Sequence, residues 1–171
     1  MQTPSHSDRS GRCRLSEIGM LHHGGMDRFI EEAESAWQSR SGELDVRVPA
    51  RLEQLSMLRA VTETIMLQAD FTLDVVVDLR VALDEVATTM ILSATPDASV
   101  DCSFRYDTRQ VMVRVESVLR SNGAWDGNAF GRSLLETLTD SMETELSAFD
   151  DALGGYPVVV RLRRLRGAEQ V

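Results

Sequence analysis

The stretch from Thr72 to Ala94 constrains the fold more than any other part of the sequence. Its large apolar residues recur at steps of three and four, which is the spacing of one face of an α-helix; they are Val75, Val76, Leu79, Leu83, Val86 and Met90. A second face, about a quarter turn away, carries Asp78, Val81, Glu85 and Thr89. Two adjacent acids, Asp84 and Glu85, lie in the middle of this predicted helix. Burying them costs free energy unless they face water or a ligand, so the acidic face is either solvated or functional.

Composition and charge limit the classes of protein to which the chain can belong. Its 171 residues are enough for one domain and a tail. A net charge of −9 leaves no general basic footprint for DNA or RNA, so we expect no direct nucleic-acid binding. No apolar run approaches the ~18–20 residues of a membrane helix, and residues 1–25 lack the apolar core of a signal peptide. We therefore expect a cytoplasmic protein with no membrane contact.

The N-terminal part of the chain is expected to lie outside the main domain. Residues 1–25 are rich in Ser, Gly, His and Arg, and this composition predicts a disordered tail. Residues 26–42 predict a short helical extension, with a helix at 27–38 that ends at the Ser-Arg-Ser-Gly run. The pair His22-His23 is too short for a metal site by itself. Cys13 and Cys102 have neither metal-ligand nor CxxC spacing, so no disulfide framework is predicted.

The remaining sequence, residues 43–166, predicts one α+β domain with elements in the order β-α-α-β-β-α-β-β. Strands are expected where apolar and polar residues alternate, and helices where apolar residues recur at helical spacing. Thr72 is the predicted N-cap of the central helix. This order predicts two layers, a mostly antiparallel sheet covered on one face by helices. The predicted strands are 43–48, 99–106, 111–118, 143–149 and 156–165, and the predicted helices are 51–68, 72–94 and 129–142.

The run Leu79–Thr89, LRVALDEVATT, resembles a known motif. It is similar to the N-box helix of the RsbW-type anti-sigma factors, which are serine kinases of the histidine-kinase-like (GHKL) ATPase superfamily. The usual pattern is aliphatic-Ala-aliphatic-x-Glu-Ala-x-Thr-Asn-Ala. Glu85 matches its glutamate and Thr88 its threonine, whereas Thr89 replaces its asparagine. The resemblance covers roughly residues 43–165 and implies a two-layer sandwich of the GHKL (Bergerat) type.

The resemblance also implies a nucleotide site for ATP and Mg²⁺. Glu85 would be the catalytic residue that polarises the nucleophile and would also contact the cofactor. Thr89 takes the position of the asparagine that helps to hold Mg²⁺ in the family, so a hydroxyl stands where the family has an amide oxygen. Mg²⁺ requires oxygen ligands in nearly ideal octahedral geometry. Gly131, at the start of the third helix, would help to cradle the phosphates through backbone N–H groups. Arg132 is either a second contact to phosphate or a surface arginine.

Other parts of the family's nucleotide site are degenerate in this sequence. In the family, the aspartate of an Asp-x-Gly-x-Gly box binds adenine. In this sequence Ser117 aligns with that aspartate and Leu119 aligns with the first glycine. A leucine removes conformational freedom and adds bulk at that position. The Gly-x-Gly at the third helix keeps only Gly131. ATP binding and kinase activity are therefore both open questions at the level of the sequence.

The resemblance implies two functions of different classes. The first is an anti-sigma factor that sequesters an alternative sigma factor until an antagonist releases it. The family arginine that contacts sigma aligns with Arg59, which could equally be an ordinary exposed helix charge, and a family glutamate aligns with Leu55. The alternative is an active serine kinase that phosphorylates the antagonist. Net acidity fits a partner with basic surfaces.

Two further surface features are open to interpretation. Family members often dimerise through the open sheet, so a homodimer through the strand around Val111–Val115 is expected. The arginines near the C-terminus indicate either solubilisation of an edge strand or contact with an acidic partner; they are Arg161, Arg163, Arg164 and Arg166.

Overall fold

A computed structural model describes residues 41–124 and 129–166 of the chain. The chain separates into two units, Met1–Gln38 and Ser39–Val171, and the described residues belong to the second. The predicted tail at 1–25 and the predicted helix at 27–38 lie outside the described residues. Gly42, which was assigned to the helical extension, instead begins the first strand.

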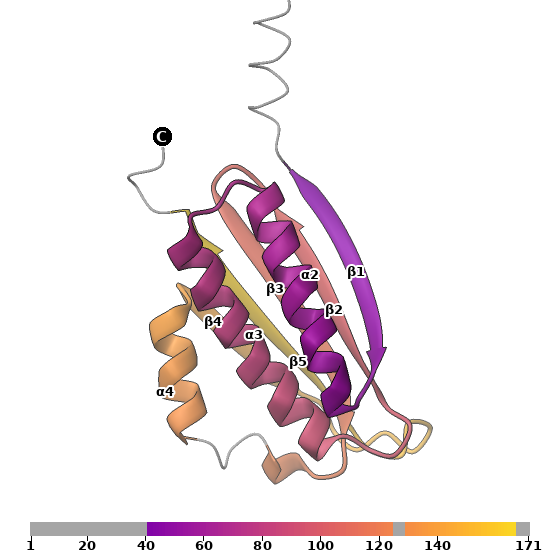
Figure 1. The fold of residues 1–171 in the computed structure, drawn as a ribbon. Helices are drawn as coiled ribbons and strands as arrows, with labels where there is room; N and C mark the ends of the chain where they lie inside the picture. The colour runs from indigo at the N-terminus through magenta and orange to yellow at the C-terminus, as the bar shows by residue number, and fades with distance from the viewer. Residues whose placement is uncertain (1–40, 125–128, 167–171) are drawn as a thin grey trace, which may run out of the picture. The chain divides into compact units, whose positions relative to one another are not determined.

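The described residues form a five-stranded sheet in the order β1-β2-β3-β5-β4, and every pair of neighbours is antiparallel. Helices α2, α3 and α4 cover one face of this sheet (Figure 1). The predicted α+β architecture, with helices on a single sheet face, is therefore confirmed. The strands are β1 Gly42–Pro49, β2 Ser99–Tyr106, β3 Gln110–Leu119, β4 Ser141–Leu146 and β5 Tyr156–Leu165.

Helix α3, Leu73–Ser93, lies at the centre of the helical layer, between α2, Leu55–Gln68, and α4, Ala129–Leu138 (Figure 1). The apolar stripe predicted for it is buried, and Leu79, Val86 and Met90 are fully inaccessible to solvent. Thr72 is at the N-cap position with extended backbone, but its side chain makes no capping hydrogen bond. Asp74 in the first turn still interacts favourably with the helix dipole.

The core lies between the helices and the inner face of the sheet. Alternate residues of the strands point into it, as a half-buried antiparallel sheet requires. Burial of large apolar side chains on both layers supplies the main driving force for the fold. The largest fully buried side chains include Phe104, Val111 and Leu162 from the sheet and Leu58, Met66 and Leu83 from the helices.

The boundary between α4 and β4 differs from the prediction. The helix was expected to reach Met142, but it ends at Leu138, and the Thr139 amide makes its last helical hydrogen bond, to the Leu135 carbonyl. The next amide, that of Asp140, donates to the Arg163 carbonyl and so begins pairing with β5. Strand β4 therefore starts at Ser141, two residues before the predicted 143, and it ends at Leu146 instead of 149.

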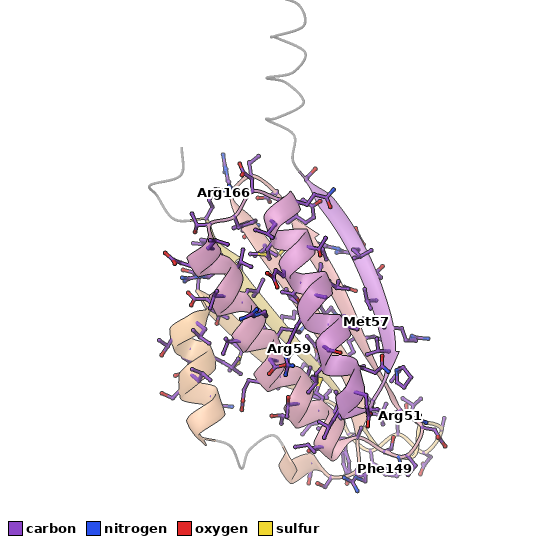
Figure 2. All side chains as sticks on the ribbon, viewed as in Figure 1. Arg51, Met57, Arg59, Phe149 and Arg166 are labelled. Atoms are coloured by element: carbon purple, nitrogen blue, oxygen red, sulfur yellow. The ribbon has the colours of Figure 1, made fainter. Side chains whose placement is uncertain are left out.

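The C-terminal arginines divide between the two faces of the sheet. Strand β5 is an inner strand between β3 and β4, so its interpretation as a solubilised edge strand was wrong. Arg164 reaches the helical layer, where it pairs with Asp78 at 3.0 Å. Arg166 donates to the Ala69 and Asp70 carbonyls at the end of α2, and its guanidinium lies 4.4 Å from the centre of the Phe71 ring (Figure 2).

Candidate functional site

Arg59 and Asp84 join the first two helices at the exposed surface of the helical layer. Nε of Arg59 donates to Asp84 at 2.7 Å and Nη2 donates to its second carboxylate oxygen at 2.9 Å. This two-pronged geometry is the one that a guanidinium and a carboxylate favour. The hydrogen bond from Arg59 to Asp84, followed by the attraction between their charges, raises the pKa of Arg59. Arg59 is thus permanently charged, and Figure 2 shows it between α2 and α3.

Helices α2 and α3, which carry Arg59 and Asp84, also present a second ion pair and exposed apolar side chains. A second link between the helices, from Arg80 on α3 to Glu63 on α2, measures 3.6 Å. Val77 and Val81 lie one turn apart on α3 and are 46% and 37% exposed. Leu55, which takes the place of a family glutamate, is buried in the core. The glutamate that the family resemblance implies near Arg59 is therefore replaced by a core residue in this chain.

The three candidate nucleotide-site residues lie on α3 and α4, two helices that pack against each other. Glu85 and Thr89 are one turn apart on α3, and both are half-buried. Gly131 is buried in the first turn of α4, and Arg132 beside it is exposed. Arg59 is not part of this group, because it lies on α2, on the other side of α3 (Figure 1). The roles of Glu85, Thr89 and Gly131 remain predictions.

The adenine side of the family's nucleotide site does not fit the residues present. Ser117 is buried in β3, and its hydroxyl donates to the Ser99 carbonyl at 2.8 Å, so it bridges two strands and supplies no carboxylate. Leu119, at the first glycine position of the box, is fully buried. A Cβ on Gly155 would lie 2.6 Å from the Leu119 carbonyl oxygen, so this end of the sheet is already tightly closed. These residues belong to the core and do not form a cradle for a nucleotide base.

No group of three His, Cys, Asp or Glu side chains that could hold a metal ion occurs within residues 41–124 and 129–166. Within the same residues, no helix is both long enough and apolar enough to span a membrane. The metal role assigned to Thr89 therefore depends on the family resemblance and has no independent support from the described geometry.

Asp78, on the same predicted face as Glu85, has a structural partner that the sequence did not reveal. Arg164 of β5 donates to Asp78 at 3.0 Å and to Asp140 at 3.4 Å, and all three side chains are about one quarter to one third exposed. The Asp140 carboxylate also accepts from the Leu165 amide at 2.8 Å. This network fixes α3 to the sheet beside the start of β4.

Two features of the site were not predicted from the sequence. Asp84 was recognised as an acid in need of water or a ligand, but its partner Arg59 was not, because the pairing depends on how α2 and α3 pack. The arginines Arg105 and Arg114 on the outer sheet face were not singled out. Their position at alternate residues of predicted strands was the signal that could have identified them.

Comparisons with known proteins agree with the fold and with the motif. No protein-family model matches the chain. The anti-sigma-F factor RsbW of Mycobacterium tuberculosis, from strains CDC 1551 / Oshkosh and ATCC 25618 / H37Rv, is 33% identical over 101 residues. That alignment covers 59% of this chain, and the chain spans only 60% of the length of these relatives.

A solved structure is similar in fold. The crystal structure of the RsbU and RsbW domains of Rv1364c from Mycobacterium tuberculosis matches with a TM-score of 0.50 and 17% sequence identity. The match covers 72% of this chain and 32% of that chain. At this identity the likeness concerns the fold alone. The chain is therefore similar in sequence to these anti-sigma-F factors over 59% of its length, and its two-layer α+β fold is similar to that of the structure that contains an RsbW domain.

Proposed function

We propose that this chain is an anti-sigma factor, which binds an alternative sigma factor in the cytoplasm and is released from it by an antagonist protein. The observation that carries the proposal is the 33% identity to an anti-sigma-F factor over 59% of the chain. The resemblance of Leu79–Thr89 to the N-box motif supports it, and the similar fold is consistent with it.

Arg59 is the proposed centre of the sigma-binding surface. Its guanidinium is held by Asp84 in the isolated chain, and both side chains are partly exposed, at 45% and 32%. Because both side chains remain accessible, a carboxylate from a partner can reach Arg59 and replace Asp84 as its acceptor. Val77 and Val81 supply exposed apolar area on α3, the helix that carries Asp84. Arginine is enriched among the residues that carry most of the binding energy at protein interfaces.

The alternative function is an ATP-dependent serine kinase that phosphorylates the antagonist, with Glu85 as the catalytic residue. Glu85, Thr89 and Gly131 support ATP and Mg²⁺ binding, whereas Ser117 and Leu119 oppose it. Because the adenine side is closed by core residues, we favour sigma binding without a requirement for nucleotide. The kinase remains the second proposal, and it makes the distinct prediction that Mg-ATP binds.

A homodimer through the outer sheet face would use side chains other than the valines of the strand around Val111–Val115. Val111, Val113 and Val115 are buried beneath the helices, so they cannot form the contact. Only the intervening residues of β3, such as Met112 and Arg114, are available on the outer face. Such a dimer would therefore depend on charged side chains more than on apolar ones.

The test is direct binding of the full chain to each purified alternative sigma factor of its source organism, measured by biolayer interferometry. We expect one of them to bind saturably and to lose its promoter-specific transcription when the chain is added. Arg59→Ala should weaken this binding on the order of tenfold or more. Arg109→Ala, an exposed arginine in the β2–β3 turn, is the matched control and should leave the affinity unchanged.

A further inference from the structure

The outer face of the sheet, opposite the helices, contains a groove with a volume of about 650 Å³. Strands β2, β3, β4 and β5 all contribute to its lining. This volume is in the range of pockets that bind small molecules. The groove is separate from Arg59 and Glu85, because those residues belong to the helices on the other side of the sheet (Figure 1). Its polar lining comprises Ser103, Arg105, Arg114, Ser141, Glu143, Arg161 and Arg163.

Strand register concentrates positive charge in the groove. Arg114 lies directly opposite Arg161 across the β3–β5 pair, and Arg163 lies opposite Met112. Arg105 is the neighbour of Met112 on its other side, across the β2–β3 pair. Four arginines and one glutamate give the lining a net charge of +3, in a chain whose total is −9. Like charges placed directly opposite each other destabilise a sheet, and a bound anion relieves that repulsion.

The carboxylates near these arginines hold them only loosely. Arg105 pairs with Glu43 at 3.0 Å and Arg161 pairs with Glu145 at 3.2 Å, while Arg114 pairs with Glu116. All of these side chains are at least one third exposed, so the pairs are of the weak, exchangeable kind. The Arg163 guanidinium donates a hydrogen bond to the Ser141 hydroxyl at 3.2 Å. The arginines can therefore exchange their present partners for a stronger acceptor.

The same carboxylates limit the size of the anion. The strand register places Glu116 on β3 and Glu145 on β4 in the row next to Arg114 and Arg161, and it places Glu43 on β1 beside Arg105, so acids flank the basic centre on two sides. An extended polyanion such as a nucleic acid would have to cross this acidic rim, and the repulsion would oppose binding. A compact anion can remain within the groove and contact several guanidinium groups, which bind phosphate oxygens in two-pronged fashion.

We propose that this groove is a binding site for a compact polyphosphate group, carried by a small molecule and held mainly by Arg114, Arg161 and Arg163. The site is independent of the proposed sigma-binding surface, so either assignment can fail without the other. Its ligand could be an inorganic polyphosphate or the phosphate chain of a nucleotide, and these share the chemistry that the arginines recognise.

The experiment is calorimetric titration of the full chain with sodium tripolyphosphate, without magnesium and at low ionic strength. We expect saturable binding with one site per chain. The double variant Arg114→Gln/Arg161→Gln should weaken it by roughly tenfold or more, because two charge-assisted contacts are lost. Glu145→Gln should instead tighten the binding severalfold, because it removes the Glu145 carboxylate that competes with the anion for Arg161. The two opposite shifts keep the test informative if the double variant folds poorly.

The control Arg51→Gln/Arg109→Gln removes the same two charges from exposed positions outside the groove and should change the affinity less than about twofold. Equal weakening by both double variants would show nonspecific attraction and overturn the proposal, as would the absence of saturable binding. Tighter binding of a single-stranded oligonucleotide than of tripolyphosphate would also overturn it. Light scattering that shows a dimer which the groove variant dissociates would assign the groove to a second copy instead. Titration with ATP then distinguishes a nucleotide from a free polyphosphate.

Discussion

On the helical side of the molecule Arg59 faces one carboxylate, Asp84, whereas on the outer sheet face Arg114 lies directly opposite another arginine, Arg161. In the first region the arginine has a two-pronged pair with a carboxylate of the neighbouring helix. In the second region the strand register holds two arginines together, and solvent-accessible carboxylates pair with each of them. The comparison teaches that the two layers place arginine in different charge environments, which is why we propose different classes of ligand for them. The following predictions test that contrast between the inner, helix-covered side and the outer face.

The largest contrast is expected in thiol reactivity. Burial raises the pKa of Cys102 to about 12, with a smaller contribution from the Asp101 charge. The adjacent Ser103 lines the outer groove. In a Cys13→Ser background, Cys102 should react with a thiol reagent at pH 8 at least about a thousandfold more slowly than the cysteine introduced by Ser103→Cys. The buried Cys102 thiol becomes accessible only when the chain unfolds, whereas the introduced thiol faces the groove. Similar rates for the two positions would contradict the assignment of faces.

The pH dependence of the same thiol has a defined sign. Its folded pKa is raised above the ordinary value of 9.0, so its contribution to stability is fully present below about pH 9. That contribution is lost as the pH rises toward 12. Denaturant midpoints measured between pH 8 and pH 11 should therefore fall more steeply for the native chain than for Cys102→Ala.

The next contrast is in the free energy of unfolding along β2. Phe104 is fully buried in the core, whereas the side chain of Arg105 is 63% exposed on the outer face. Phe104→Ala should lower the free energy of unfolding by about 3–5 kcal/mol, through lost burial and the cavity left behind. Arg105→Ala should change it by no more than about 0.5 kcal/mol. Urea unfolding curves of the two variants provide the measurement, and comparable losses would contradict the inward and outward alternation.

A smaller contrast is expected between two ion pairs that involve β5. The half-buried pair of Asp78 and Arg164 joins β5 to α3, and the exposed pair of Glu145 and Arg161 lies on the outer face. A double-mutant cycle with alanine should give a coupling energy of about 1–2 kcal/mol for the first pair, since solvent screens it less. The second cycle should give about 0–0.5 kcal/mol. Equal coupling in the two cycles would remove this difference between the faces.

The smallest effect is expected from Mg-ATP. Because Ser117 and Leu119 close the adenine side, 1 mM Mg-ATP should raise the melting temperature by less than about 1 °C. The scans should include magnesium and physiological salt, so that binding in the arginine groove is screened. A large shift that Glu85→Ala abolishes would instead favour the kinase function and would identify Glu85 as part of the site.

Much of the fold could be predicted because its elements repeat at clear periods. The bounds predicted for β2 and β5, 99–106 and 156–165, agree with the structure, and α3 differs from its predicted range by one residue at each end. The end of α4 was misplaced because Leu138 and Met142 continue a helical spacing, while the amide of Asp140 leaves the helix to donate to the Arg163 carbonyl of β5. Local periodicity carries no information about such a hydrogen bond.

The candidate site was less predictable, because it depends on contacts between elements. Arg59 and Asp84 were both singled out, but their pairing requires the particular rotation of α2 against α3. Strand alternation alone places Arg161 and Arg164 on opposite faces of the sheet. The groove also requires β5 to lie beside β3, and the order of elements along the chain does not determine that neighbour. Long-range register is the information that the sequence alone did not supply.

The central claim is that the helical surface around Arg59 binds a sigma factor. The most direct measurement is the affinity of the full chain for the cognate sigma factor, compared between Arg59→Ala and Asp84→Asn. The account predicts weaker binding for the first variant and equal or tighter binding for the second, because the second frees the Arg59 guanidinium for the partner. No binding to any sigma factor of the source organism, or unchanged affinity in Arg59→Ala, would contradict it.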